Sequence, residues 1–328
     1  MIPVKTYVEA IREAMRDEMR RDSRVMVLGE DVGYKGGVFG ATEGLQKEFG
    51  DARVLDTPLA EATIVGVGIG AALNGMLPVA EIQFVDFILP AVDQIISEAA
   101  KMRYRSNNDW HVPMVIRAPF GGGVHGGLYH SQSLEALFCH VPGLRVVIPS
   151  NPHDAKGLLV AAIRDPDPVM YFEHKKAYRS MKGEVPDGDY TVPLDRAEVV
   201  REGEDITVLT YGLMVGTALE AADRLAADSI SVEVVDLRSL RPLDRDAIVS
   251  SARKCGKVLV AQEANLAVSV SSEVSAIIAE DCFEYLDAPV RRIGGPEIPA
   301  MPFAKPLETA YIVGVDRLES ALRRLAEY

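Results

Sequence analysis

Short apolar runs alternate with longer amphipathic segments through the first half of the chain. The apolar runs cover residues 25–28, 53–55, 78–84, 114–117, 144–148 and 169–172. Between them lie segments long enough for helices, among them residues 87–104 and 152–164. Strands separated by helix-length segments are typical of βαβ units. This half of the chain is therefore predicted to form a mainly parallel sheet with helices on both faces.

The same alternation returns in the second half after a polar interruption at residues 175–204, which contains the breakers Pro186 and Gly188. Further apolar runs follow at residues 206–211, 232–236, 258–261 and 290–293, and residues 315–325 have helical spacing. The pattern predicts an α/β fold of two consecutive three-layer domains with mainly parallel sheets. The expected boundaries are 1–185 for the first domain, 186–204 for a linker and 205–328 for the second domain.

Composition and net charge limit the classes of protein to which the chain can belong. Of the 328 residues, 48% are hydrophobic and 25% are charged, which is the balance of a globular chain. The net charge of −13 repels phosphate backbones and anionic lipid, so neither nucleic acid nor a membrane is an expected partner. The early charged, helix-periodic residues do not resemble a signal peptide. Three scattered cysteines, Cys139, Cys255 and Cys282, favour a reducing, cytoplasmic location over a disulfide framework.

A glycine pattern at residues 66–71, Gly-x-Gly-x-x-Ala, formally fits a dinucleotide-binding fingerprint. Such a fingerprint needs a strand directly before its first glycine. Here Thr57 suits a helix N-cap and Pro58 the first helical position, so the glycines are expected inside a helix. We interpret them as small residues that let the helix pack closely against a neighbour.

Glu61 lies early in this predicted helix and is followed by mostly small or apolar residues. One interpretation is an acid stabilised by the positive end of the helix dipole. The other is a catalytic carboxyl, because an apolar environment raises a carboxyl pKa and lets the group donate a proton near neutral pH. The spacing alone leaves both open.

Residues 120–133 form an unusual loop with five glycines and two histidines, between a predicted strand and a predicted helix. The spacing of His125 and His130 does not favour a shared metal ion. His130 is interpreted either as a neighbour of a helix cap or as an acid/base group that titrates near pH 7. Ser131 could be a nucleophile, although the Gly-x-Ser-x-Gly elbow is absent.

Ten stretches together resemble the beta subunit of the thiamine-diphosphate-dependent decarboxylating component of 2-oxoacid dehydrogenase complexes, most closely the branched-chain type. They are Val-Leu-Gly-Glu-Asp-Val-Gly (27–33), Gly-Gly-Val-Phe (36–39), Asp-Thr-Pro-Leu-Ala-Glu (56–61), Ala-Glu-Ile-Gln-Phe (80–84), Lys-Met-Arg-Tyr-Arg-Ser (101–106), Gly-Gly-Gly-Val-His-Gly (121–126), Tyr-His-Ser-Gln-Ser (129–133), Asp-Ala-Lys-Gly-Leu-Leu (154–159), Val-Asp-Leu-Arg-Ser-Leu (235–240) and Glu-Ile-Pro-Ala-Met-Pro (297–302). The resemblance covers essentially the whole chain. It implies a transketolase-like pyrimidine-binding domain followed by a transketolase-like C-terminal assembly domain.

The resemblance also implies roles for particular residues. Glu61 would hydrogen-bond the aminopyrimidine ring of thiamine diphosphate and promote deprotonation of the thiazolium carbon. Phe87 would pack on the pyrimidine ring, with Gln83 and Phe84 lining the same strand end. His130 would supply a proton during reductive acylation of the lipoyl group. Glu30 would be an acid lying between paired active sites.

The chain lacks the Gly-Asp-Gly motif, followed by an asparagine, with which thiamine enzymes bind diphosphate and magnesium. The family explains the absence, since an alpha subunit supplies that motif. The expected assembly is an alpha2-beta2 heterotetramer, with magnesium on the alpha subunit, that delivers its acyl group to a lipoyl acyltransferase core. Potassium near Asp165 is a further family feature, although Asp167 stands where some relatives have asparagine.

The substrate expected from residues 127–133 is a branched-chain 2-oxoacid, with pyruvate or acetoin as the alternative. Two alternatives belong to other classes. One is a flavin- or nucleotide-binding electron-transfer subunit, which needs the glycines of residues 66–70 in a strand-to-helix turn. The other is a noncatalytic scaffold subunit.

Overall fold

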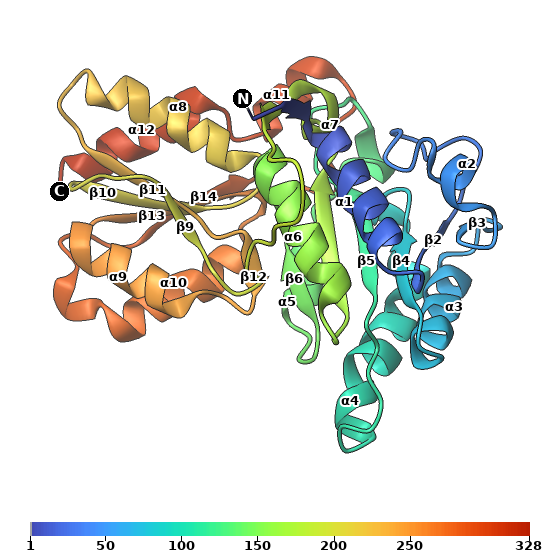
Figure 1. Ribbon diagram of the computed structural model, residues 1–328. Helices are drawn as coiled ribbons and strands as arrows, with labels where there is room; N and C mark the ends of the chain where they lie inside the picture. Colours follow the sequence, from blue (N-terminus) through green and yellow to red (C-terminus); the bar gives the residue numbers. More distant parts are fainter. Residues whose placement is uncertain (1) are drawn as a thin grey trace. The chain divides into compact units, whose positions relative to one another are not determined.

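The computed structural model describes residues 2–328, which divide into two compact units (Figure 1). Unit 1 comprises the described residues up to Phe120 together with Leu137–Leu194. Unit 2 comprises Gly121–Ala136 and Asp195–Tyr328. Each domain expected from sequence is one continuous stretch of chain. In the structure, Gly121–Ala136 lies within the first expected stretch but belongs to unit 2. The glycine-rich loop, expected within the first domain, belongs to unit 2 by its contacts.

Unit 1 is built on a parallel sheet with the strand order β6-β7-β5-β4-β2-β3. The strands are β2 (Val25–Gly29), β3 (Val54–Asp56), β4 (Leu77–Glu81), β5 (Val115–Phe120), β6 (Arg145–Val147) and β7 (Val169–His174). A separate antiparallel pair joins β1 (Val4–Thr6) to β8 (Lys182–Glu184). The helices are α1 (Tyr7–Arg21), α2 (Leu45–Phe49), α3 (Glu61–Leu73), α4 (Met102–Arg105), α6 (Pro152–Arg164) and α7 (Ala177–Ser180). Helix α5 (Glu135–Cys139) begins in unit 2 and ends in unit 1.

Helix α1 shows how local sequence fixes an element of unit 1. Thr6 and Glu9 form a capping box, in which the Glu9 amide donates to Thr6 Oγ1 and the Thr6 amide donates to Glu9 Oε2. The apolar face of the helix then packs on α6. Two ion pairs between the helices reinforce this contact: Lys156 with Glu13 at 2.6 Å and Arg164 with Glu18 at 2.6 Å. Lys156 and Glu18 are the buried members of these pairs.

Unit 2 contains a five-stranded sheet with the order β14-β13-β10-β11-β9, parallel except for the edge strand β9. The strands are β9 (Glu198–Arg201), β10 (Ile206–Thr210), β11 (Val232–Asp236), β13 (Val258–Asn265) and β14 (Arg291–Gly295), with a short β12 (Ser239–Arg241) outside this sheet. The helices are α8 (Met214–Ala226), α9 (Arg245–Cys255), α10 (Val270–Asp281), α11 (Lys305–Tyr311) and α12 (Val315–Ala326).

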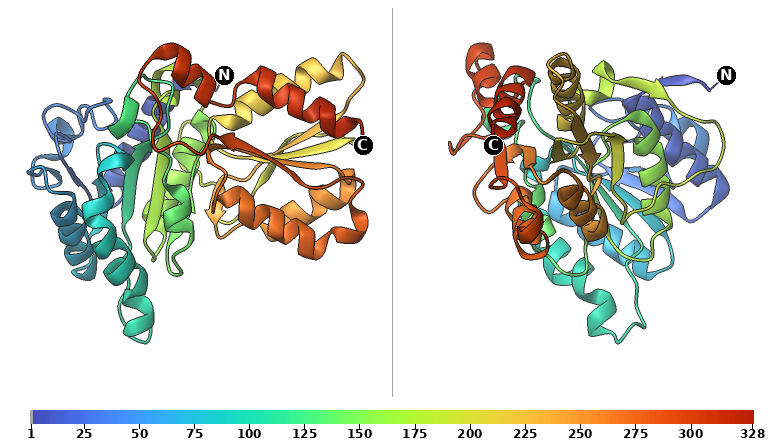
Figure 2. Two further views of the ribbon diagram at one scale, coloured as in Figure 1. Left: turned by 180° about the vertical axis from the view of Figure 1, so that it is seen from behind. Right: turned by 90° about the vertical axis from the view of Figure 1, so that its left-hand side faces the viewer.

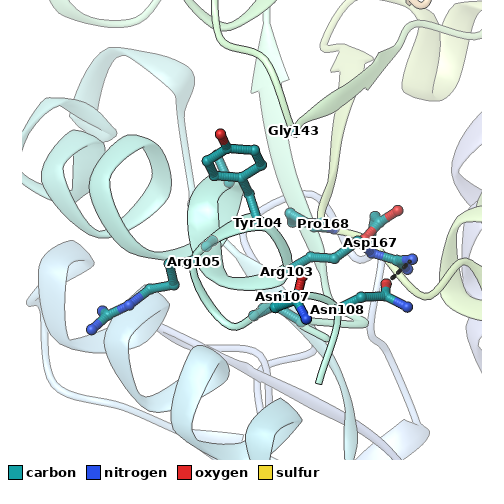
Figure 3. A pocket seen from close by; sticks show the side chains of 11 residues that line it. Arg103, Tyr104, Arg105, Asn107, Asn108, Gly143, Asp167 and Pro168 are labelled. Atoms are coloured by element: carbon teal, nitrogen blue, oxygen red, sulfur yellow. Dashed lines mark hydrogen bonds and ion pairs between the residues drawn. The ribbon is translucent and has the colours of Figure 1, made fainter. Parts of the chain in front are cut away.

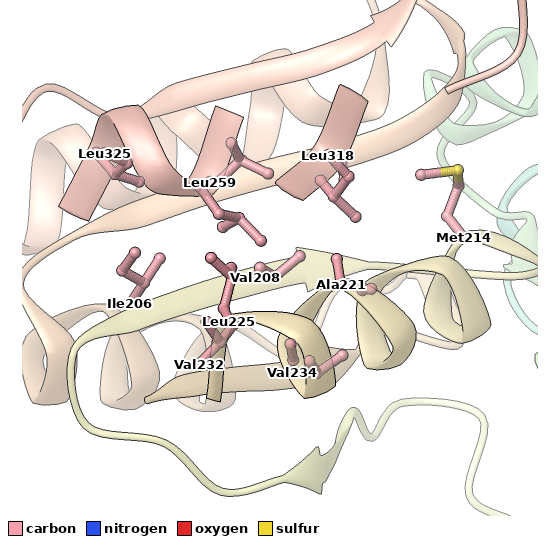
Figure 4. Close-up of a cluster of buried hydrophobic side chains, with 14 of the residues drawn as sticks. Ile206, Val208, Met214, Ala221, Leu225, Val232, Val234, Leu259, Leu318 and Leu325 are labelled. Atoms are coloured by element: carbon pink, nitrogen blue, oxygen red, sulfur yellow. The ribbon is translucent and has the colours of Figure 1, made fainter. Parts of the chain in front are cut away.

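The helices of unit 2 cover its sheet from both sides. Helices α8 and α12 lie on one face, and α9 and α10 lie on the other, as both views show (Figures 1 and 2). Between the sheet and the first helix pair lies a continuous apolar core, in which Val208, Leu225 and Leu318 are fully buried (Figure 4). The two-domain α/β fold predicted from the hydrophobic pattern is therefore confirmed.

Local expectations fail where the sequence signal is short or interrupted. The helix expected at residues 87–104 is broken into the 3-10 turns Val85–Phe87 and Leu89–Ala91, a π turn at Gln94–Glu98, a 3-10 turn at Ala99–Lys101 and helix α4. Pro90 contributes to the break, because its ring nitrogen cannot donate a helical hydrogen bond. The polar segment at 175–204 contains α7, β8 and β9. Strand β4 ends at Glu81, three residues before the expected end at position 84.

Two further features concern the whole chain. In the part of the chain that the structure describes, no helix has the length and apolar character needed to cross a lipid bilayer. The three cysteines, Cys139, Cys255 and Cys282, carry free thiols.

Candidate functional site

Neighbouring parallel strands of unit 1 bring two of the expected site residues together. Glu30 follows β2, and Gln83 follows β4, which is paired with β2 in register. The Gln83 side-chain amide donates to the Glu30 carbonyl oxygen at 3.4 Å. The carboxyl ends of such strands are where open α/β sheets bind ligands. Both residues therefore lie at the edge of the sheet that is expected to hold a site.

Helix α3 places Glu61 at the same end of the sheet, although its start corrects the sequence prediction. The helix begins at Glu61 and not at Pro58, and its N-cap is Ala60. Thr57 is not the cap, because its amide donates to the Gly29 carbonyl at 2.9 Å and so prolongs the pairing of β3 with β2. Glu61 is thus the first residue of the helix, at its positive end. The Thr57 Oγ1 atom is buried without a hydrogen-bond partner among residues 2–328.

Glu30 and Glu61 form an electrostatically coupled pair of carboxyl groups. Burial raises the pKa of Glu30, and the nearby charges of Asp31 and Glu61 raise it further. Glu61 is half-buried: Ile64 and Val65 behind it are buried, whereas Thr63 is exposed.

A cluster of aromatic rings follows the end of β4. The Phe84 ring meets Phe87 edge-on with 5.7 Å between ring centres, and it meets Phe39, in the segment between β2 and α2, at 5.4 Å. The Lys175 ammonium lies 5.5 Å from the centre of the Phe84 ring. Phe84 and Phe87 are half-buried, so part of each ring surface is open. Such a cluster can bury one face of a heteroaromatic ligand by stacking.

A buried charge network that sequence reasoning missed lies under the strand ends. Arg117 is fully buried and binds Glu173 through Nε and Nη2, at 2.6 and 2.7 Å, while its Nη1 binds Glu81 at 2.6 Å. The Tyr178 hydroxyl donates to Glu173. Burial raises the pKa of Glu81, although Arg117 opposes this effect. The available signal was the presence of charged residues within otherwise apolar strands, which requires partners in a sheet interior.

The network constrains the segment that carries Phe39. A Cβ atom on Gly37 would lie 3.2 Å from Glu81 Oε1, so the glycine permits the segment to pass close to the buried carboxyl. Gly37 also has a φ of 78°, which favours glycine. The end of β4 and the segment carrying Phe39 are therefore held together.

His130 lies in unit 2. Its loop is closed by the Gly121 amide, which donates to the Gln132 carbonyl at 2.9 Å. His130 follows a short 3-10 turn at Gly127–Tyr129 and is half-buried. His125 contacts Glu308 through Nδ1 at 2.6 Å, so the two histidines have different surroundings. No cluster of three or more histidine, cysteine or carboxylate side chains suited to a metal ion occurs among residues 2–328.

The glycines of the apparent dinucleotide motif lie inside α3, as expected, and not in a strand-to-helix turn. Close packing is confirmed for Gly68, where an added Cβ atom would lie 2.7 Å from Met114 Cε. Gly70 has no such neighbour within 4 Å. The geometry needed for the nucleotide-binding alternative is thus absent from this stretch of the described chain.

The region around Asp165 bears on the expected potassium site. Asp165 pairs with Arg145 at 2.9 Å, and Asp167 pairs with Arg103 at 2.6 Å. In Figure 3 the side chains of Arg103, Asn108 and Asp167 lie together beside a cavity of about 690 Å³, and Arg105 points away. Both carboxylates are thus already neutralised by guanidinium groups. The potassium site near Asp165 stays a prediction.

The strand ends of unit 1 do fit an aminopyrimidine ring. They combine half-buried aromatic rings, the carboxyl groups of Glu30 and Glu61 and the buried Thr57 hydroxyl oxygen, which can form a hydrogen bond to a ligand. A carboxyl group facing a ring nitrogen can exchange a proton with it, whereas the aromatic rings supply apolar contact. Among residues 2–328 there is no cluster of side chains suited to the metal ion that a diphosphate group needs.

Comparison with known proteins agrees with this geometry. Residues 4–181 match the transketolase pyrimidine-binding domain, and residues 195–318 match the transketolase C-terminal domain. A solved structure described as a split-gene transketolase, inactive beta4 tetramer, has the same fold, with a TM-score of 0.80, 24% identity and 98% of each chain covered.

Curated relatives identify the family more narrowly. The 2-oxoisovalerate dehydrogenase subunit beta of Bacillus subtilis is 62% identical and covers 99% of both chains. The pyruvate dehydrogenase E1 component subunit beta of the same organism is 49% identical over 98% of this chain and 99% of its own. The 2-oxoisovalerate dehydrogenase subunit beta of Pseudomonas aeruginosa is 47% identical over 98% and 95%. The chain therefore belongs to the transketolase-like family of 2-oxoacid dehydrogenase beta subunits.

Proposed function

We propose that this chain is the beta subunit of a branched-chain 2-oxoacid dehydrogenase. With an alpha subunit, it decarboxylates the 2-oxoacid on thiamine diphosphate and transfers the acyl group to a lipoyl group. The observation that supports the chemistry is that Glu30, Glu61 and the Phe84–Phe87 ring pair all follow the carboxyl ends of β2, β3 and β4 in the chain, with the charge of Glu61 acting on Glu30. The observation that supports the substrate is the 62% identity to a 2-oxoisovalerate dehydrogenase subunit beta.

Glu61 is proposed to exchange a proton with the aminopyrimidine ring. When bound, thiamine diphosphate supplies the nucleophilic carbon and stabilises the negative charge left by decarboxylation. Glu61 contributes a carboxyl group at the start of α3, partly shielded from water. Phe87 and Phe84 are proposed to bury a face of the ring, and Gln83 is proposed to line its edge. Glu30 is a second acid within electrostatic reach of Glu61.

His130 is proposed as the proton donor in reductive acylation. Opening a lipoyl disulfide produces a thiolate, and a positioned acid lowers the cost of that charge. The diphosphate and magnesium are proposed to bind the alpha subunit, in an alpha2-beta2 heterotetramer that serves an acyltransferase core. None of the three cysteines forms a disulfide bond, which supports a reducing, cytoplasmic location.

The proposal is tested by Glu61→Gln in the tetramer co-purified with its alpha partner. Glutamine keeps the shape of the side chain but cannot exchange the proton, so the rate of thiamine-dependent decarboxylation should fall at least about 100-fold. The control Asp316→Asn removes an exposed acid from the first turn of α12 and should leave the rate unchanged. Near-normal decarboxylation by the Glu61→Gln tetramer would contradict the role of Glu61.

Pyruvate is the second candidate substrate, because a pyruvate dehydrogenase subunit also aligns over nearly the whole chain at 49% identity. The comparison that decides is kcat/KM for 2-oxoisovalerate against kcat/KM for pyruvate on the same tetramer. We expect the branched substrate to be preferred. A preference for pyruvate would reassign the substrate and keep the reaction class.

A further inference from the structure

The glycine-rich loop that carries His130 is bound by buried carboxylates of unit 2. Glu308 of α11 accepts hydrogen bonds at Oε1 from the Gly123 amide, at 2.9 Å, and from the His125 amide, at 3.1 Å. Its Oε2 lies 2.6 Å from His125 Nδ1. Only 2% of Glu308 is exposed, so these contacts stand in for the water that a carboxylate would otherwise bind.

One more carboxylate and a tyrosine hydroxyl bind the two ends of the same segment. Glu263 of β13 accepts from the Gly122 amide at 2.7 Å, and Tyr211 donates to Glu135 at 2.7 Å. Glu263 and Glu135 are also buried. The loop is therefore attached to one unit from its first glycines to the start of α5.

The backbone conformation of the loop requires stabilising contacts. Gly123 and Gly127 have φ values of 79° and 65°, and His125, which has a side chain, has a φ of 58°. A side chain in the left-handed region is strained, so compensating contacts must stabilise it. Glu308 supplies them at His125 itself, because it binds both the amide and the imidazole of that residue.

The constraint continues from His125 to His130. A Cβ atom on Gly126 would lie 2.7 Å from both the Cβ atom and the carbonyl oxygen of His130. Gly127 lies against Phe303, which is two residues before the start of α11. The position of His130 therefore depends on the backbone at residues 123–127, and that backbone depends on Glu308.

We propose that Glu308 is a positioning residue for His130. The inference rests on the proposed role of His130 in acyl transfer. It gives the C-terminal domain a part in catalysis beyond the assembly role expected from the sequence. Displacing an acid by about 1 Å can cost up to about 100-fold in rate, so a positioning role is measurable.

The test compares two rates on the alpha–beta tetramer of each variant. One is decarboxylation of 2-oxoisovalerate with an artificial electron acceptor, and the other is acylation of a purified lipoyl domain. Glu308→Ala should lower the ratio of acylation to decarboxylation at least about tenfold. Glu308→Gln retains an oxygen acceptor for the two amides and should recover most of the ratio.

Glu233→Ala is the matched control. It also removes a buried carboxylate from unit 2, but Glu233 binds Lys254 and Thr207 and not the loop. Its ratio should stay at the wild-type value. An equal fall in Glu233→Ala, or an unchanged ratio in a folded Glu308→Ala, would overturn the positioning role.

Two further measurements keep the proposal testable if Glu308→Ala does not fold. His125→Ala removes only the exposed imidazole contact and should lower the ratio less than tenfold but measurably. Amide hydrogen exchange in Glu308→Gln should be faster at residues 123–127 than in wild type, because a neutral acceptor binds the amides more weakly. Unchanged exchange and an unchanged His125→Ala ratio would refute the proposal. A wild-type tetramer without decarboxylation would instead refute the proposed function, and the exchange experiment would still test the loop.

Discussion

At the scale of single residues, helix α3 offers a direct contrast between two glycines. Gly68→Ala should be less stable than Gly70→Ala, because its new Cβ atom would lie 2.7 Å from Met114 Cε and the buried methionine would have to shift. Gly70→Ala meets no atom within 4 Å and should stabilise the helix by up to about 1 kcal/mol. Chemical denaturation of the two variants measures both free energies. A stabilising Gly68→Ala would show that Met114 can move aside.

The residues of the candidate site differ in how far the sequence could place them. Glu30 follows an apolar run and Gln83 lies at the end of another, so the rule about strand ends puts them at one edge of the sheet. Glu308 could not be found in this way. Its partners are backbone amides more than 180 positions away in the chain, and an amide carries no sequence signal.

At the scale of elements, the contact between α1 and α6 depends on buried charge. Burial alone would raise the pKa of Glu18, but hydrogen bonds from Arg164 and Arg21 outweigh this effect, and the pKa is lowered. A carboxyl group whose pKa is lowered on folding stabilises the protein above its ordinary pKa of 4.5. That stabilisation is lost as the pH falls through the lowered value.

Glu18→Gln should therefore reduce the free energy of unfolding by about 2 kcal/mol at pH 7, and by progressively less as the pH falls below 4.5 and through the lowered pKa of Glu18. Denaturation curves measured across this range test the sign. The exposed pair of Glu43 and Arg12 provides the control, and Glu43→Gln should change the free energy by less than about 1 kcal/mol. If Glu18→Gln still lowered the free energy of unfolding at low pH, the cause would be lost packing and not lost charge.

Long periodic elements were predictable, and short ones were not. Helix α6 spans the predicted residues because Asn151 caps it, Pro152 starts it and its apolar positions repeat through the whole length. Strands β1 and β8 have three residues each and mostly polar faces. Their pairing depends on contacts distant in sequence, which a local pattern does not contain.

At the scale of the whole molecule, the chain supplies acids and aromatic rings but no described cluster for a metal ion. Purified alone, it should not bind thiamine diphosphate and magnesium at concentrations that saturate the alpha–beta complex. Isothermal titration of the chain, of the alpha subunit and of the complex measures this difference. Saturable binding of the cofactor and magnesium by the beta chain alone would contradict the shared site.

The segment Gly121–Ala136 also limits how the molecule can be divided. The chain passes between the units at 120/121, 136/137 and 194/195, so neither unit is a single stretch of polypeptide. A cut at 194/195 separates the two family domains in sequence, yet it leaves the histidine loop on one fragment and Glu263 and Glu308 on the other. Expressing the halves separately, or exchanging one of them between relatives, would therefore detach this loop from its anchors unless the two halves associate again.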